Sequence, residues 1–198
     1  MASMWVDPAR VREFVDFQSF YDWLAQHHAT ADEIWIRLYK KGSGHPSISA
    51  REAVDAELCW GWVDGIRKGL DATSFLQRYT PRRRNSVWSR INRDNVERLT
   101  AAGLMRPAGQ AEVDRAKADG RWAAAYSVSE SEPPEALVAA IRADPEAAAF
   151  YSRLTAQNRF ALTFRVLALK TEAGRSRAVA RFVEMLRRGE TIYPQARK

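Results

Sequence analysis

The chain of 198 residues is 46% hydrophobic and 28% charged, as expected of a soluble globular protein with one domain, or one domain and a helical annex. No stretch reaches the ~20 apolar residues of a membrane span, and the N-terminus lacks the basic region and apolar core of a signal peptide. The net charge of +7 favours acidic partners such as nucleic acid, phosphorylated metabolites or a membrane surface, although a solvated basic surface explains it equally well.

The first 60 residues predict an arm, a helix, a strand and a second helix. Residues 1–15 form the expected arm. The first helix is expected to begin at Ser19, with Asp22 three residues on, as in a capping box. Residues 33–39 alternate between two faces and predict a strand with one buried face, whose other face carries Trp35, Arg37 and Tyr39.

A loop at residues 40–46 precedes the second helix. Ser49 and Glu52 form a capping box at the start of this helix, which runs to about residue 59. Glu52 therefore has a structural role before any catalytic one.

The middle of the chain predicts a hairpin and two helices. Residues 62–67 and 74–80 read as paired strands, and we prefer this long connection to the alternative of a tight turn at Asp64 and Gly65. Asn92 is the expected N-cap of a helix that ends at Gly103. The next helix opens at Pro107 and ends at Gly120.

Residues 127–134 are rich in serine and proline and predict a linker. We therefore divide the chain into residues 1–128 and residues 129–198, packed together as one unit. Beyond the linker the chain is helical, and the helix with Phe160 and Phe164 is apolar on two faces, so it should be the most buried. The fold class is α+β: a small antiparallel sheet packed with helices, followed by a helical C-terminal region.

The central stretch suggests a binding site. Residues 78–93 hold six arginines and no acid, and three of the seven tryptophans lie within residues 60–88. Guanidinium groups beside indoles favour an anion or a planar ligand. Asp64 would orient an arginine and Trp88 would cover the ligand. The candidate ligand-binding residues are Lys40, Trp62, Asp64, Arg78, Arg82, Arg83, Trp88 and Asn92.

Three other hypotheses stay open. An enzyme would use Asp64 or Glu52 as general base, with Lys40 or Arg82 stabilising an anion. A nucleic-acid binder would stack bases on Trp88 and Tyr79. A scaffold would expose its tryptophans at an interface.

The single Cys59 and three histidines predict no disulfide, no metal site and no cofactor. Cys59 is expected to be a buried small residue. We expect a cytoplasmic protein of unknown oligomeric state.

The chain resembles the YdeI/OmpD-associated family, also called bacteriocin-protection or OmdA-type proteins, over about residues 14–190. The motifs that carry the resemblance lie at residues 34–41, 52–65, 79–92, 103–109 and 120–126. The chain departs from the family where Lys170-Thr171-Glu172 is followed by alanine and glycine rather than Thr-Arg. The resemblance implies an α+β domain followed by helices, a link to antimicrobial-peptide resistance and envelope stress, and no established reaction. A direct trap for cationic peptides is disfavoured by the charge of +7.

Overall fold

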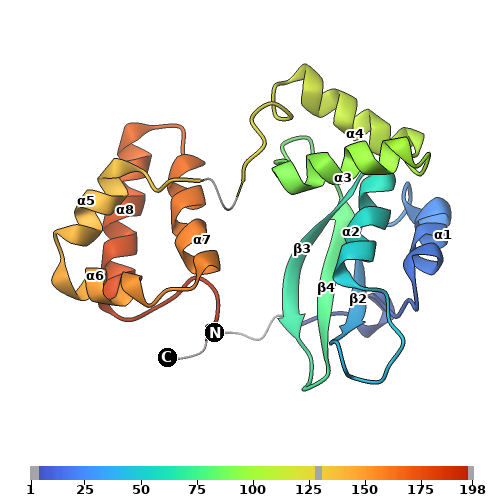
Figure 1. Cartoon of the computed structure of the whole chain (residues 1–198), viewed down its shortest axis with the longest axis horizontal. Helices are drawn as coiled ribbons and strands as arrows, with labels where there is room; N and C mark the ends of the chain where they lie inside the picture. The colour runs from blue at the N-terminus through green and yellow to red at the C-terminus, as the bar shows by residue number, and fades with distance from the viewer. Residues whose placement is uncertain (1–4, 128–130, 196–198) are drawn as a thin grey trace. The chain divides into compact units, whose positions relative to one another are not determined.

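The computed structural model describes residues 5–127 and 131–195, which form two compact units divided between Tyr126 and Ser127 (Figure 1). The first unit holds a four-stranded sheet with helices, and the second is helical, so the predicted α+β class is confirmed. The centre of the predicted linker, residues 128–130, lies outside the described residues. The expected packing of the two parts as one unit stays a prediction.

The sheet has the strand order β1-β2-β4-β3. Its strands are β1 (Val11–Arg12), β2 (Ile34–Tyr39), β3 (Trp62–Gly69) and β4 (Ser74–Pro81), with β1 parallel to β2 and the other pairs antiparallel. The long connection between β3 and β4 is confirmed, and no tight turn forms at Asp64. The register shifts between Asp64 and Arg67, which makes a β-bulge, and the buried Gln77 bridges it. The Gln77 side chain donates to Gly65 O at 2.9 Å and accepts from Arg67 Nε at 2.8 Å.

The expected N-terminal arm is structured from Pro8 onward. A 3-10 turn, Pro8–Arg10, leads into β1, and Val11 pairs with Trp35 of β2. Trp35 is only 4% exposed, so the prediction that β2 buries one face alone is wrong at this position. Sequence periodicity could not show this, because the covering segment lies more than twenty residues away in the chain.

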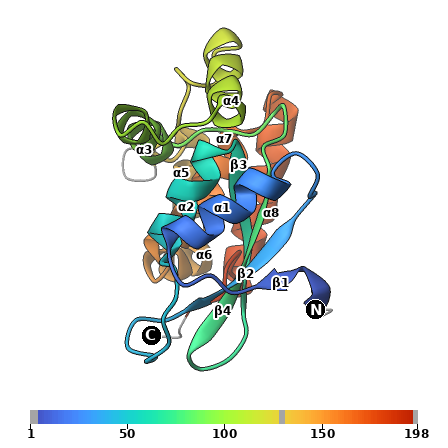
Figure 2. The same cartoon turned by 90° about the vertical axis from the view of Figure 1, so that its right-hand side faces the viewer.

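Helices α1 (Phe17–His27) and α2 (Ala50–Cys59) lie in front of the sheet in Figure 2. Phe20 of α1 packs into the core with Ile36 of β2, and neither is exposed. The predicted capping box of α2 is confirmed, because Ser49 and Glu52 exchange hydrogen bonds. The predicted start of α1 is wrong: Asp16 is the N-cap, and Ser19 stands at the third helical position as its capping-box partner.

Helices α3 (Arg90–Ala101) and α4 (Pro107–Ala118) complete the first unit. Ser89, not Asn92, is the N-cap of α3, and its hydroxyl accepts from the Asn92 backbone N–H at 3.2 Å. The predicted stops are confirmed by left-handed glycines, with φ of +69° at Gly103 and +82° at Gly120.

The end of α2 meets the start of α4 at a contact that only glycine permits. A Cβ atom on Gly109 would lie 2.3 Å from Cys59 O and 2.6 Å from Leu58 O. Gly61, with φ of +74°, would place a Cβ atom 2.9 Å from Ala108 O. Arg106 N donates to Cys59 O at 3.1 Å, which joins the two segments by a backbone hydrogen bond.

The second unit contains the helices α5 (Glu135–Arg142), α6 (Pro145–Ser152), α7 (Ala156–Leu167) and α8 (Glu172–Arg187). Leu137, Leu162 and Phe182 meet in its core. The prediction that α7 is the most buried of these helices is confirmed, since five of its twelve residues are buried, although only the face with Leu162 enters this core and Leu167 is 51% exposed. Within residues 5–127 and 131–195, no helix is both long and apolar enough to cross a membrane.

The glycine contact predicts a steric penalty. In a helix, Gly→Ala normally stabilises by about 1 kcal/mol, but Gly109→Ala must push apart two backbone segments. We expect it to lower the free energy of unfolding by about 1–3 kcal/mol in urea denaturation. The control is Gly69→Ala, whose added Cβ atom meets nothing within 4 Å and should change stability by no more than about 0.5 kcal/mol. Equal midpoints for the two variants would contradict the contact.

Candidate functional site

Three of the predicted site residues meet at the end of β4, but as interior packing. The Arg82 guanidinium lies 3.8 Å from the centre of the Trp88 ring, donates through Nε to Trp62 O at 3.2 Å and through Nη1 to Val87 O at 3.3 Å. Arg82 is 6% exposed, and both indoles are 2% exposed or less. This arginine holds the segment after β4 against the start of β3, so it is not presented to a ligand.

Tyr79 is equally enclosed, at 1% exposure. The two aromatic rings that were expected to stack nucleic-acid bases, Tyr79 and Trp88, therefore offer no open face. Trp62 and Trp88 are interior, so neither offers the exposed tryptophan that the scaffold hypothesis requires. Arg83 is exposed, and its side chain has no hydrogen-bond or ionic partner within residues 5–127.

A buried carboxylate stands near Arg82. Glu57 of α2 is 0% exposed, and neither of its carboxylate oxygens has a hydrogen-bond partner among the described residues. Burial, and secondarily the negative charge of Asp64, raise the pKa of Glu57 well above its ordinary value, while the positive charge of Arg82 acts in the opposite direction. Burial therefore favours the protonated form of Glu57, and sequence reasoning missed this residue because a helix position gives no sign of full burial.

The other predicted residues are scattered. Lys40 Nζ donates to Ala72 O at 2.8 Å beside the β3–β4 connection. Asn92 belongs to the first turn of α3. Glu52 caps α2, which gives it a structural role; a general base at the exposed Asp64 stays a prediction. Cys59 is buried, as predicted, and burial raises the pKa of its thiol to about 12.

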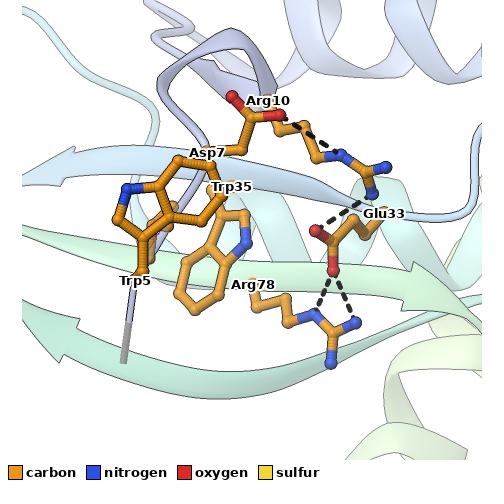
Figure 3. A pocket seen from close by; sticks show the side chains of 7 residues that line it. Trp5, Asp7, Arg10, Glu33, Trp35 and Arg78 are labelled. Atoms are coloured by element: carbon orange, nitrogen blue, oxygen red, sulfur yellow. Dashed lines mark hydrogen bonds and ion pairs between the residues drawn. The ribbon is translucent and has the colours of Figure 1, made fainter. Parts of the chain in front are cut away.

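Arg78 alone among the predicted residues lines a described pocket. This pocket, of about 390 Å³, lies where the N-terminal segment meets β2 and β4 (Figure 3). Figure 3 shows the Trp5 indole beside Trp35, with Arg10 and Arg78 on either side of Glu33. Its lining residues are Trp5, Val6, Asp7, Arg10, Glu33, Trp35 and Arg78.

Glu33 fixes both guanidinium groups of the pocket. Its Oε1 lies 3.1 Å from Arg10 Nη1, and its Oε2 accepts from Arg78 Nε at 2.6 Å and lies 2.5 Å from Arg78 Nη2. The Glu33 side chain is 17% exposed, so these pairs are partly shielded from water. The remaining Nη1 of Arg78 has no hydrogen-bond partner within residues 5–127. One carboxylate therefore orients two arginines and leaves donors unused.

Acidic groups surround Arg10 as well. Asp32 Oδ1 accepts from Arg10 Nη1 at 3.0 Å, and Asp7 Oδ2 lies 3.9 Å from Arg10 Nε. The hydrogen bond from Arg10 lowers the pKa of Asp32, and the same bond raises the pKa of Arg10. The lining holds two cations, Arg10 and Arg78, against two acids, Asp7 and Glu33, so its net charge is about zero. A ligand must then be recognised by geometry rather than by bulk charge.

The N-terminal segment explains why the pocket was not predicted. Arg10 and Trp35 come together because β1 pairs with β2, and Arg78 joins them because it is the register partner of Trp35 across β2 and β4. The alternation of residues 33–39 did place Trp35 and Arg37 on the face away from the helices. That alternation was the available sign that these side chains share a face. The pairing of β1 with β2 could not be predicted, because a strand of two residues shows no alternation in the sequence.

The fold defines the chain as an α+β domain followed by a separate helical unit, and comparisons with known families agree with that division. The chain belongs to the family described as a domain of unknown function, DUF8412, whose model matches residues 12–112, just over half of its length. Residues 130–189 match the family described as Bacteriocin-protection, YdeI or OmpD-Associated, which confirms the predicted relationship. No curated protein and no solved structure matches significantly.

The two family models match different parts of the chain, and the motifs that suggested the bacteriocin-protection family mostly lie outside the part that its model matches. Most of the motifs that carry it lie between residues 34 and 109, within the stretch matched by DUF8412, whereas the bacteriocin-protection match falls on the helical unit. The protein is thus related to bacteriocin-protection proteins through its C-terminal part. The pocket of Figure 3 lies in the other part.

The buried Glu57 predicts a pH dependence of stability. Because its pKa is raised in the folded protein, the folded state keeps a proton that the unfolded state loses above about pH 4.3, and the free energy of unfolding then falls as the pH rises. Glu57→Gln should flatten this fall between about pH 5 and pH 8. Urea denaturation across that range measures it. The exposed Glu97→Gln is the control and should keep the slope of the unmodified protein; equal slopes for both variants would exclude a protonated Glu57.

Proposed function

We propose that this bacteriocin-protection-related protein binds a small anionic ligand in the pocket formed by Trp5, Arg10, Glu33, Trp35 and Arg78. The observation that carries the proposal is Glu33, which forms ion pairs with both arginines and so holds two guanidinium groups in the lining of one pocket. Holding the donors in place before binding lowers the entropy cost of ordering them when a ligand arrives. The volume of about 390 Å³ is within the range of small-molecule sites.

The acids of the pocket narrow the ligand class. A dianion such as a phosphate would meet Glu33 and Asp7 at close range, and their repulsion would offset the attraction of the arginines. A carboxylate carries one charge and fits the planar donor fork of an arginine. The indoles of Trp5 and Trp35 supply flat apolar surface for the rest of the ligand. We therefore propose a planar monocarboxylate as the ligand class.

The wider setting of the proposal is a cytoplasmic protein of stress or peptide resistance. The family match supports the link to bacteriocin protection, and the single buried cysteine is in keeping with a reducing compartment. A small-ligand site supports an indirect role in protection, since the charge of +7 disfavours capture of cationic peptides.

Ligand binding can be tested with four related probes. Thermal shift and calorimetry would compare benzoate, cyclohexanecarboxylate, phenyl phosphate and benzamide at 50 mM and 500 mM salt. We expect benzoate to bind most tightly and to keep its affinity at high salt, because a partly buried guanidinium pair is screened little. Tighter binding of phenyl phosphate, or loss of all binding at high salt, would reject the planar monocarboxylate.

Variants locate the binding. Arg78→Met keeps the apolar stem and removes the charged donors, so benzoate affinity should fall about tenfold or more. Arg83→Met removes an equal charge from an exposed, unpaired position and should leave affinity unchanged. Trp5→Ala changes a residue that is 77% exposed, so the fold should persist while affinity falls severalfold. Equal losses in Arg78→Met and Arg83→Met would show that only general charge is sensed.

A further inference from the structure

The α7–α8 end of the helical unit concentrates positive charge. Residues 165–181 cover the last turn of α7, the connection and the first ten residues of α8. They contain five cations and one acid, Glu172. All five cations are exposed, and within residues 131–195 no carboxylate lies within 4.0 Å of any of them. These cations, which we call the basic turn, are Arg165, Lys170, Arg175, Arg177 and Arg181.

The arginines at the other end of α8 differ. Arg187 Nε lies 3.3 Å from Asp144 of α6, and Arg188 Nε lies 3.3 Å from Glu190. Glu184 lies within 3.6 Å of both arginines. In Figure 1 the α7–α8 connection is at the upper end of this unit, away from α6. Charge is therefore compensated at one end of α8 and left uncompensated at the other.

Exposed leucines accompany the cations of the basic turn. Leu167 is 51% exposed and Leu169 is 36% exposed. Arg175 Nε donates to Leu169 O at 2.9 Å, which keeps its guanidinium beside the second leucine. The connection is ordered, since Thr171 caps α8 by accepting from Gly174 N at 3.2 Å. A defined turn thus presents Arg175 together with the exposed Leu169.

We infer that the basic turn docks this protein on the surface of an anionic lipid bilayer. Lipid headgroups supply the negative charge that the five cations lack, and the two leucines can enter the boundary between headgroups and acyl chains. Nucleic acid is the less suitable partner for this surface. Single strands are bound by cations together with stacking aromatic rings, and residues 165–181 contain no aromatic residue. The inference rests on the helical unit alone and is independent of the pocket of Figure 3.

Vesicle flotation of the full chain tests the inference. Vesicles of phosphatidylcholine with 30% phosphatidylglycerol should carry the protein at 50 mM salt, and vesicles of pure phosphatidylcholine should not. High salt, at 500 mM, should release it, because surface attraction to anionic lipid is screened within a Debye length. Equal flotation with both kinds of vesicle, or none with either, would overturn the proposal.

Matched variants separate this surface from general positive charge. Arg177→Ala combined with Arg181→Ala should weaken binding to anionic vesicles about 25-fold, at about fivefold for each cation removed. Arg187→Ala combined with Arg188→Ala removes the same charge from the compensated end and should change binding less than twofold. An equal loss in the two double variants would refute docking by the basic turn.

The leucines distinguish a bilayer from nucleic acid. Leu167→Ser combined with Leu169→Ser keeps every cation and changes two exposed side chains, so the fold should persist while vesicle binding falls at least fivefold. A 20-base-pair DNA duplex is the competing probe. If the leucine variant binds vesicles as well as the unmodified protein and the duplex displaces both equally, the surface is a nucleic-acid site and the bilayer proposal is wrong.

Discussion

The first unit depends on how closely the backbone of α4 can approach the end of α2. Two glycines, Gly61 and Gly109, remove the side chains that would stand between these segments, and the backbone of Arg106 donates to Cys59 O across the contact. Because β3 begins directly after Gly61, the same contact sets where Trp62 enters the core. The role of this tryptophan-rich stretch is therefore architectural: its residue types are those needed to bring a helix end, a strand start and a second helix together.

Features encoded by neighbouring residues were predictable from the sequence. The capping box of Ser49 and Glu52 and the helix-ending Gly103 and Gly120 follow from spacing alone. The predictions that were wrong concern two cases: helix starts where several adjacent residues can act as N-cap, and strands whose pairing partner is distant in sequence. Asp16 outcompetes Ser19 as N-cap of α1, and Ser89 replaces Asn92, since a short polar side chain is suitable at several adjacent positions. The pairing of β1 with β2 needs contacts that periodicity does not record.

For the candidate site, the sequence indicated which residue types line the pocket but not which residues supply them. Arginine and tryptophan do line the pocket of Figure 3, as the composition suggested, but only Arg78 comes from the stretch that appeared richest in both. An arginine and a tryptophan that are close in sequence contact each other instead of a ligand: Arg82 stacks on Trp88 and is buried in the core. Arg10 and Trp35 are distant in sequence and became a pocket only through the sheet. A sequence stretch that is dense in arginine and tryptophan can thus indicate residues that pack against each other in the core rather than a ligand-binding site.

The two edges of the sheet limit how other chains can approach it. An exposed edge strand offers unpaired backbone groups to any passing strand, which leads to aggregation or strand exchange. Here one edge is β1, only two residues long, and the other is β3, whose regular hydrogen-bonding pattern is interrupted by the bulge between Asp64 and Arg67. Neither offers a long regular template. The sheet is therefore poorly suited to growth by strand addition, which guards a protein with an apolar core against forming intermolecular β-structure.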